Sequence, residues 1–501
     1  MIYLSIYLNI IYAFICVVLA QKFLHIFQLR DYNAKRYLAY FNFRFWVFEA
    51  VLMGIFVAQI LIFNLFFVIL INLILLPIFA IIFNNISISQ KTPIIYTSRL
   101  KRIYVLTAIL LILPIFFKKM AILSPILMIF APIFANFLNF FDKIKNKNYI
   151  LAAQKKLKNS TAKIIAITGS NGKTTTKNIL FEMLKTQFKV VASPKSFNTP
   201  LGLAKFLNQT NLDVDFIILE YGARHKNDVK NLCKIYGADF GIITQIAPQH
   251  LQTFKSIENV AKAKQKLSEF LNLKPCVFNV DNDYVLQMFN QKNGGKISIS
   301  TKSKNANFYG QKISIKNFKT EFEICFENQK ILCQTCLLGQ HNVTDILLAF
   351  GLAFSLGVST KNLQFAIENL QYIPHRLEHI KAGLNILDDS YNCSLESAKE
   401  SLSVLSACPG KKMVVTPGII EAGKNQFDIN FELGKLIAKF ENIVLIGLTN
   451  KAALTKGILS VVPTKKILFA PTLENAKQYF KFLSSANDTL LLLNDLPDDY
   501  K

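Results

Sequence analysis

The chain has 501 residues, of which 52% are hydrophobic and 43 are phenylalanine, and its formal net charge is +25 at pH 7. This length suggests roughly three or four domains, and the hydrophobic fraction is high for a wholly soluble enzyme. The positive charge comes without a recognition module, a zinc-ligand spacing or a basic–aromatic stripe, so we expect no nucleic acid partner. The eight cysteines are scattered, as is usual in a reducing cytosol.

The hydrophobic excess lies before residue 142. The candidate membrane-spanning segments are residues 1–20, 45–83, 103–117 and 121–141. A helix that spans a bilayer needs about 20 apolar residues, so residues 45–83 are long enough for two such helices. Together they predict about five spans, with a hydrophobic multi-helix soluble domain as the alternative.

Lysine and arginine are enriched in the stretches between these segments, at residues 22–44 and 85–102, and again after residue 142. Such loops usually face the cytoplasm. We therefore expect residues 1–145 to form a multi-pass region in the bacterial inner (cytoplasmic) membrane, with the lipid bilayer as a partner. The catalytic domains would then lie in the cytoplasm.

From about residue 160 the pattern alternates between short apolar runs and amphipathic segments, which indicates a mostly parallel sheet flanked by helices. The expected strands are residues 163–168, 189–193, 215–220, 240–246 and 276–280. The expected helices are residues 173–186, 227–236 and 257–271. Residues 296–338 look rich in β-structure, and a helix is expected over residues 342–356.

Pro374 marks a domain boundary, after which the α/β alternation resumes. The expected strands of this second sheet are residues 384–388, 412–416, 442–447, 466–469 and 489–493. The predicted fold class is an α-helical membrane region followed by two α/β domains. These are a P-loop-type central ATPase sheet domain at residues 160–372 and a smaller Rossmann-like C-terminal domain at residues 373–501.

Residues 163–176 read KIIAITGSNGKTTT, a β-branched run that ends in a glycine-rich turn and opens a helix. The backbone N–H groups of such a turn bind phosphate, Lys173 would reach the β- and γ-phosphates, and Thr174 or Thr175 would bind Mg²⁺. The common P-loop has four residues between its glycines, whereas only Ser170 and Asn171 lie between Gly169 and Gly172 here. The compact form after a strand predicts a specialised ATP site.

Three further residues follow the strands and could complete this site. Glu220 ends the run DFIILE, at the sheet edge where α/β proteins bind ligands, and its carboxylate suits Mg²⁺; the alternative is a solvated strand-end glutamate. His250 follows the next strand and could be a metal ligand, a polar anchor or merely exposed. Lys264 lies in a run with Lys262 and Lys266, which is normally a solvated helix face.

Six motifs, in this order, resemble the Mur ligase family of ATP-dependent amide ligases in peptidoglycan precursor synthesis. They are TGSNGKTTT at 168–176, LEYGA at 219–223, AKAK at 261–264 after the His250 segment, GQHN at 339–342, HR at 375–376 and DDSYN at 388–392. The resemblance covers about residues 160–501. Together with FNTPLGLA at 197–204, the motifs look most similar to the branch of the family that adds the terminal dipeptide.

The resemblance implies a role for each matching residue. The turn from Gly169 to Gly172, with Lys173, Thr174 and Thr175, would bind ATP, and Lys264 matches a lysine that is carbamylated to hold a second Mg²⁺. Four groups of residues share the remaining roles. They are Thr174, Glu220 and His250 around Mg²⁺, Asn342 at the adenine, Arg376 and Asp389 at the domain hinge, and Asn198, Thr199, Tyr391 and Asn392 at the substrates. Lys173, Lys264, His250 and Arg376 would be the catalytic set.

The implied substrates are ATP, a UDP-N-acetylmuramoyl-tripeptide and D-alanyl-D-alanine. The peptide carboxylate would attack the γ-phosphate to give an acyl phosphate, and the dipeptide amine would then displace phosphate. Lys173 and two Mg²⁺ ions would neutralise the approaching anions, and the C-terminal domain would shield the acyl phosphate from water.

The sequence departs from the family in three places. Nothing reads as the usual N-terminal domain that binds the UDP part, Thr199 stands where a second asparagine is usual, and residues 491–500 (LLLNDLPDDY) lack a Lys-Gly-Ser stretch. The alternatives are therefore a Mur-type ligase with a different, even lipid-linked, carboxylate acceptor, and a scaffold with a degenerate nucleotide-sensing domain. A transport ATPase would need an acidic cluster and a signature loop, and we find neither.

Overall fold

The computed structural model describes most of the chain after residue 140 and short stretches before it. The described residues are 20–21, 23–29, 32, 34–38, 96–112, 129–130, 132–133, 136, 140–194, 197–249, 251–391, 393–420, 425–483 and 485–494. They fall into two compact units, one made mainly of residues 1–145 and the other mainly of residues 146–496.

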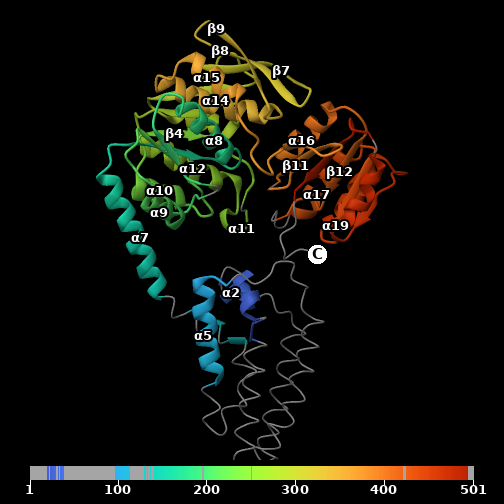
Figure 1. The fold of residues 1–501 in the computed structure, drawn as a ribbon, viewed down its shortest axis with the longest axis horizontal. Coiled ribbons are helices and arrows are strands. Elements are labelled where there is room, and N and C mark those ends of the chain that lie inside the picture. The colour runs from blue at the N-terminus through green and yellow to red at the C-terminus, as the bar shows by residue number, and fades with distance from the viewer. Residues whose placement is uncertain are drawn as a thin grey trace, which may run out of the picture. The chain divides into compact units, whose positions relative to one another are not determined.

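In the first unit the described helices include α2 (Ala34–Leu38) and α5 (Ser98–Ile112) (Figure 1). The predicted span 103–117 overlaps α5, whose first five residues include Arg99, Lys101 and Arg102; residues 113–117 of that span lie outside the described residues. The predicted spans 1–20, 45–83 and 121–141 lie almost entirely outside the described residues.

Within the described part of the chain, no helix has both the length and the apolar character that crossing a bilayer requires. On this finding we correct the prediction of a multi-pass protein of the bacterial inner membrane with the bilayer as its partner.

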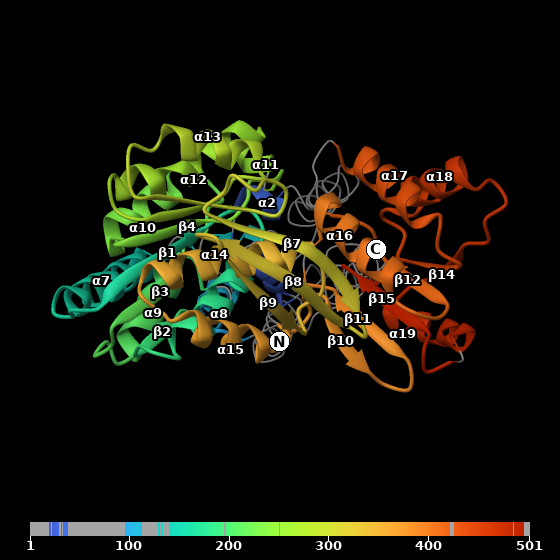
Figure 2. The ribbon, with the colours of Figure 1, turned by 90° about the horizontal axis from the view of Figure 1, so that it is seen from above.

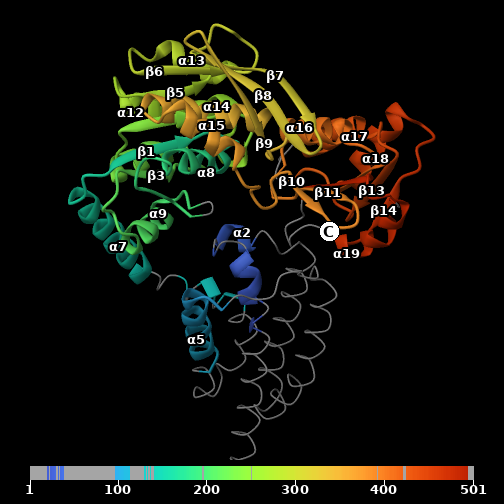
Figure 3. The ribbon, with the colours of Figure 1, turned by 45° about the horizontal axis from the view of Figure 1, so that its top comes forward.

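The larger unit contains a nine-stranded sheet with the order β2-β3-β1-β4-β5-β6-β7-β8-β9. Neighbouring strands are parallel from β2 to β7, and β7, β8 and β9 form antiparallel hairpins (Figure 3). The strands are β1 (Lys163–Thr168), β2 (Val190–Ala192), β3 (Phe216–Glu220), β4 (Phe240–Ile243), β5 (Cys276–Asn279), β6 (Lys296–Ser300), β7 (Phe308–Lys316), β8 (Lys319–Phe326) and β9 (Gln329–Thr335).

Helices pack against both faces of this sheet. One apolar core joins the sheet to α8 (Lys173–Leu184), α14 (Gln340–Ser355) and α15 (Thr360–Glu368). The other joins it to α7 (Phe140–Lys158), α9 (Pro200–Gln209), α10 (Asp228–Tyr236), α12 (Ile257–Leu271) and α13 (Asp283–Gln291), and the short α11 (Leu251–Phe254) precedes α12. In α8 the buried apolar residues Ile179, Leu180, Met183 and Leu184 recur at helical spacing. Each contributes about 1.5–3 kcal/mol when buried, which fixes the helix against the sheet.

The register of the central strands decides where the site lies. β1 pairs with β3 so that Ile167 is opposite Glu220, and it pairs with β4 so that Thr168 is opposite Ile243. The carboxyl ends of the three strands therefore meet at one sheet edge, and the segments that follow them converge there.

A second sheet has six strands in the order β10-β11-β15-β12-β13-β14. Only the pair β10–β11 is antiparallel. The strands are β10 (Glu378–Lys381), β11 (Asn385–Asp389), β12 (Lys412–Thr416), β13 (Asn442–Ile446), β14 (Leu468–Ala470) and β15 (Thr489–Leu493). The flanking helices are α16 (Leu395–Ala407), α17 (Gln426–Ile437), α18 (Lys451–Val461), α19 (Leu473–Ala476) and the 3₁₀ helix η4 (Lys477–Phe482), with α17 and α18 side by side (Figure 2).

The predicted strands of both sheets are confirmed to within a few residues, and three of them, 163–168, 412–416 and 489–493, have the predicted bounds. The described fold is thus a mixed α/β architecture with two sheets. The exact domain limits at residues 160–372 and 373–501 stay a prediction.

Candidate functional site

The glycine-rich turn connects β1 to α8, and its two glycines have no room for a side chain. A Cβ atom on Gly169 would lie 1.8 Å from Thr244 Oγ1, and one on Gly172 would lie 2.4 Å from Asp345 Oδ1. Gly172 also has φ +81°, a left-handed conformation that favours glycine. The turn is therefore tightly enclosed by the segment after β4 and by α14.

The turn is fixed by hydrogen bonds to the chain after β4. Ser170 N donates to Gln245 O at 2.6 Å, Ser170 Oγ donates to Ala247 O at 3.1 Å, and Thr244 Oγ1 donates to Asn171 O at 2.6 Å. The buried Asn171 Nδ2 has no hydrogen-bond partner among the described residues. A preformed turn with an unsatisfied donor fits an anionic ligand such as a phosphate.

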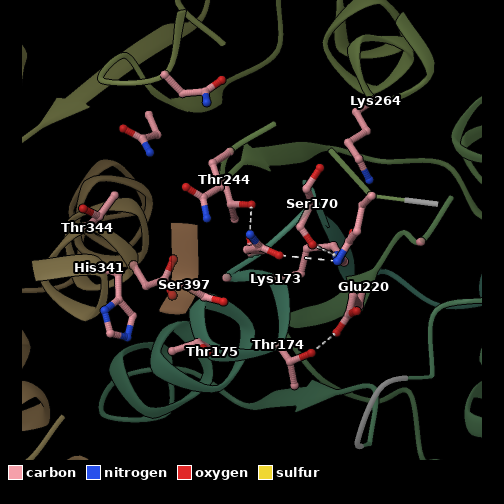
Figure 4. A pocket seen from close by; sticks show the side chains of 18 of the residues that line it. Ser170, Lys173, Thr174, Thr175, Glu220, Thr244, Lys264, His341, Thr344 and Ser397 are labelled. Atoms are coloured by element: carbon pink, nitrogen blue, oxygen red, sulfur yellow. Dashed lines mark hydrogen bonds between the residues drawn. The ribbon is translucent and has the colours of Figure 1, made fainter. Parts of the chain in front are cut away.

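Two lysine ammonium groups meet at the turn (Figure 4). Lys173 Nζ donates to the carbonyl oxygens of Gly169 and Ser170 at 2.8 Å each, and Lys264 Nζ donates to the same Gly169 oxygen at 2.7 Å. Burial lowers the pKa of both lysines, and for Lys264 the neighbouring Lys173 lowers it further. Two like charges on one carbonyl oxygen indicate a site that an anion would stabilise.

Glu220 is the acidic partner of this region and is only 1% exposed. Its Oε2 accepts a hydrogen bond from Thr174 Oγ1 at 2.7 Å, and its Oε1 accepts one from Asn198 Nδ2 at 3.0 Å (Figure 4). Thr174 and Glu220 thus offer hard oxygen ligands of the kind Mg²⁺ prefers. Thr199 caps α9, because its side chain accepts a hydrogen bond from Gly202 N.

The residues predicted from the second sheet face the same cavity, whose volume is about 900 Å³. Arg376 lies 4.4 Å above the ring of Tyr391, and Asp389 Oδ2 accepts a hydrogen bond from Ser401 at 2.5 Å. Burial raises the pKa of Asp389. Asn342 also lines the cavity, and its side chain donates to Leu338 O at 2.7 Å.

The described site residues predicted from sequence line this one cavity. They are Ser170, Asn171, Gly172, Lys173, Thr174, Thr175, Asn198, Thr199, Glu220, Lys264, Asn342, Arg376, Asp389 and Tyr391. The carbonyl oxygen of Gly169 accepts hydrogen bonds from both Lys173 and Lys264. The predicted residues His250 and Asn392 lie outside the described residues. The solvated-face interpretation of Lys264 is wrong, because this lysine is 2% exposed whereas Lys262 is exposed.

Three cavity or near-cavity residues were missed by sequence reasoning. Asp345 is buried against the turn and accepts from Thr176 Oγ1 at 3.1 Å, and burial raises its pKa to about 7. His341 Nδ1 lies 3.9 Å from Glu400 Oε2. Burial lowers the pKa of His341, but the carboxylates of Glu400, Asp345 and Asp389 together raise it above its usual value. Lys177 is 1% exposed. The only sequence signal was the position of these residues next to the quoted motifs.

Comparison with known proteins agrees with this geometry. Residues 167–353 match the model of the Mur ligase middle domain. The chain is 29% identical over 271 residues to the UDP-N-acetylmuramoyl-tripeptide–D-alanyl-D-alanine ligase of Buchnera aphidicola subsp. Baizongia pistaciae, covering 53% of this chain and 58% of that one. It is 25% identical over 300 residues to the Escherichia coli K12 ligase of the same name, covering 59% and 66%. The chain thus spans about three fifths of the length of these relatives.

Solved structures share the fold. MurF of Acinetobacter baumannii has a TM-score of 0.63 at 22% identity, covering 70% of this chain and 77% of that one. MurF ligase of Thermotoga maritima, solved in complex with ADP, has a TM-score of 0.61 at 23% identity, covering 70% and 80%. Residues 167–353 therefore match the Mur ligase middle domain, and the two-sheet architecture around them is similar in fold to these solved structures.

Proposed function

We propose that this chain is an ATP-dependent amide ligase that joins D-alanyl-D-alanine to the peptide carboxylate of a UDP-N-acetylmuramoyl-tripeptide. The observation that carries the proposal is the convergence of Lys173, Glu220 and Lys264 on one preformed turn, in a cavity shared with Arg376. The similar proteins that are named as ligases of these two substrates support the choice of substrates. Residues 160–372 would be the central ATP-binding domain and residues 373–501 the C-terminal domain.

In the proposed reaction ATP binds with its phosphates on the turn from Gly169 to Gly172. The backbone N–H groups and the Asn171 amide would donate to phosphate oxygens, and Lys173 would leave its two carbonyl partners for the phosphates. Thr174 and Glu220 would hold Mg²⁺, which supplies charge neutralisation as two anions approach. The undescribed His250 stays a candidate for the same ion.

Lys264 is the candidate for carbamylation. Its lowered pKa makes a neutral amine more accessible, and a neutral amine is the form that reacts with CO₂. The resulting carbamate would place a negative group beside Lys173, in place of a second ammonium. The two oxygens of the carbamate could then hold a second Mg²⁺.

The acceptor would bind beside Glu220, on the segment with Asn198 and Thr199, and the incoming amine would bind near Tyr391 and Asn392. Arg376 faces the cavity from the second sheet, next to the place where negative charge develops. The peptide carboxylate would attack the γ-phosphate, forming an acyl phosphate and ADP. The amine of D-alanyl-D-alanine would then attack the acyl carbon and release phosphate.

The experiment measures phosphate release by the full chain with Mg²⁺ and ATP, with each of the two other substrates omitted in turn. We expect release only when both the muramoyl tripeptide and D-alanyl-D-alanine are present, and we expect the product to carry the added dipeptide by mass spectrometry. Lys173→Ala is the inactive control. Phosphate release at the same rate with and without D-alanyl-D-alanine would refute this assignment.

A Mur-type ligase with a different carboxylate acceptor is the second candidate. It is favoured by one observation: the Thr199 hydroxyl, where the family usually has an asparagine, is occupied in capping α9. A different set of acceptor contacts follows from this. Substituting the tripeptide by other carboxylates in the same assay, including lipid-linked ones, separates the two candidates.

A further inference from the structure

A second lysine of α8, Lys177, is buried close to the site, although it neither lines the cavity nor belongs to the phosphate turn. It follows Lys173 by one helical turn and is 1% exposed. Burying an ammonium group is unfavourable unless polar partners compensate for the lost hydration. A buried lysine at this position should therefore make a polar interaction that an apolar residue of equal size cannot make.

Lys177 holds the end of β2. Its Nζ donates to Ser193 O at 2.6 Å. Ser193 is itself tied to β3, because its N–H donates to Ile218 O at 2.9 Å and its Oγ accepts from Glu220 N at 3.4 Å. Lys177 therefore reaches the backbone of Glu220 through one intervening residue.

The side chain of Glu220 returns to the same helix. Thr174, three residues before Lys177 and on the same face of α8, donates to Glu220 Oε2 at 2.7 Å. Glu220 is thus attached to α8 twice, by its side chain through Thr174 and by its backbone through Ser193 and Lys177. This closed circuit fixes the direction of the carboxylate relative to the turn.

The chain that leaves Ser193 leads to the proposed acceptor residues. Asn198 Nδ2 donates to Glu220 Oε1 at 3.0 Å, and Gly222 N donates to Asn198 O at 3.1 Å. Lys177 therefore binds Ser193, and Asn198 binds the same Glu220 to which Ser193 is hydrogen-bonded. Burial lowers the pKa of Lys177, and the nearby Glu220 carboxylate opposes that effect.

We propose that Lys177 is a positioning residue: through Ser193 it holds Glu220, and with Glu220 the side chain of Asn198, in register with the phosphate-turn helix, so that an acceptor carboxylate bound beside them is aligned with the nucleotide. This inference rests on the proposed function for the identity of the acceptor. The proposal predicts a specific defect in a variant that lacks the Lys177 charge: the nucleotide still binds, but kcat/KM for the acceptor falls.

The test compares Lys177→Met, which keeps an unbranched side chain of nearly the same length but removes the charge, with Lys177→Arg, which keeps the positive charge. Lys185→Met is the matched control, since Lys185 lies at the end of the same helix with its side chain 48% exposed and paired with Glu182. For each protein we measure the thermal midpoint, the Kd for Mg·ADP by calorimetry, and kcat and KM for ATP, acceptor and dipeptide.

For Lys177→Met we expect Kd for Mg·ADP within about twofold of wild type and kcat/KM for the acceptor at least about tenfold lower, since small misplacements have effects of this size. Lys177→Arg should recover part of the loss and Lys185→Met should match wild type. An unchanged kcat/KM, or equal losses in nucleotide affinity and acceptor use, would overturn the proposal, because equal losses mean a general support of the fold.

If Lys177→Met does not fold, Ser193→Ala decides the question, since it removes the Oγ that accepts from Glu220 N and keeps the carbonyl bound to Lys177. A selective fall in acceptor kcat/KM supports the circuit, and wild-type kinetics contradict it. The wild-type protein is the control for the proposed function. If it shows no dipeptide-dependent phosphate release, the assignment of substrates has failed, and the same comparison is then made with the carboxylate that does support release.

Discussion

The buried carboxyl group of Asp345 gives the sharpest prediction about pH. It lies against the phosphate turn, where a Cβ on Gly172 would be 2.4 Å from its Oδ1, and it accepts a hydrogen bond from Thr176. Burial raises its pKa from 3.8 to about 7, although the positive groups of His341, Arg376 and Lys173 act in the opposite direction. The folded protein therefore binds this proton more tightly than the unfolded chain does.

The sign of the effect follows from linkage. Below pH 3.8 the group is protonated in both states, and the free energy of unfolding that depends on its protonation is fully present and does not change with pH. Between pH 3.8 and 7 the unfolded chain loses the proton first, so the free energy of unfolding falls as pH rises, and above pH 7 the loss is complete. At 1.36 kcal/mol per pH unit, the total is about 4 kcal/mol.

The assay is denaturant unfolding of the full chain, followed by far-UV circular dichroism between pH 5 and 8.5, for wild type and Asp345→Asn. The difference in stability, variant minus wild type, should increase with pH up to about pH 7 and then level off. Asp428→Asn, which replaces an exposed carboxylate on α17, is the matched control. Parallel pH profiles for wild type and Asp345→Asn would refute the reasoning.

Three further predictions concern the cavity. Gly172→Ala should lower the free energy of unfolding by about 1–3 kcal/mol and weaken nucleotide binding, because it strains a left-handed residue and drives a Cβ into Asp345; unchanged denaturation and ADP titration curves would contradict this. Lys264→Ala should abolish ligation and recover activity with short carboxylic acids; activity without added acid would exclude a carbamate role. Arg376→Met should lower kcat about a hundredfold or more, since it removes a cation facing the cavity, and equal kcat in a phosphate-release assay would rule this out. The Tyr391→Leu variant, which removes only the ring under Arg376, is its control and should lose less.

The sequence was most informative where local pattern and tertiary structure agree. The run from Lys163 to Thr168 is β-branched and bounded by glycine, so both the strand and the turn after it could be predicted. Glu220 was placed correctly because the carboxyl end of a parallel strand is a defined position in the fold.

The residues that were missed or misjudged depend on packing between distant segments. Lys264 sits in a lysine-rich helix, and only the approach of α12 to the turn makes one lysine buried while its neighbour Lys262 stays exposed. Asp345 and Lys177 are buried by the contact of α14 and α8 with each other and with the sheet. The prediction of a multi-pass region at residues 1–145 was wrong because apolar composition is typical of several kinds of helical structure and does not by itself identify a bilayer span.

The strand order of the second sheet has a consequence for how the protein is made. β15 (Thr489–Leu493) pairs with β11 on one side and β12 on the other, so the latest in sequence of the described strands of this sheet completes its middle. On the ribosome the nine-stranded sheet can form while β11 and β12 still wait, with unpaired edges, for a partner some 70 residues downstream of β12. Loss of the residues around Leu491 would divide this sheet in two and leave both halves open to aggregation.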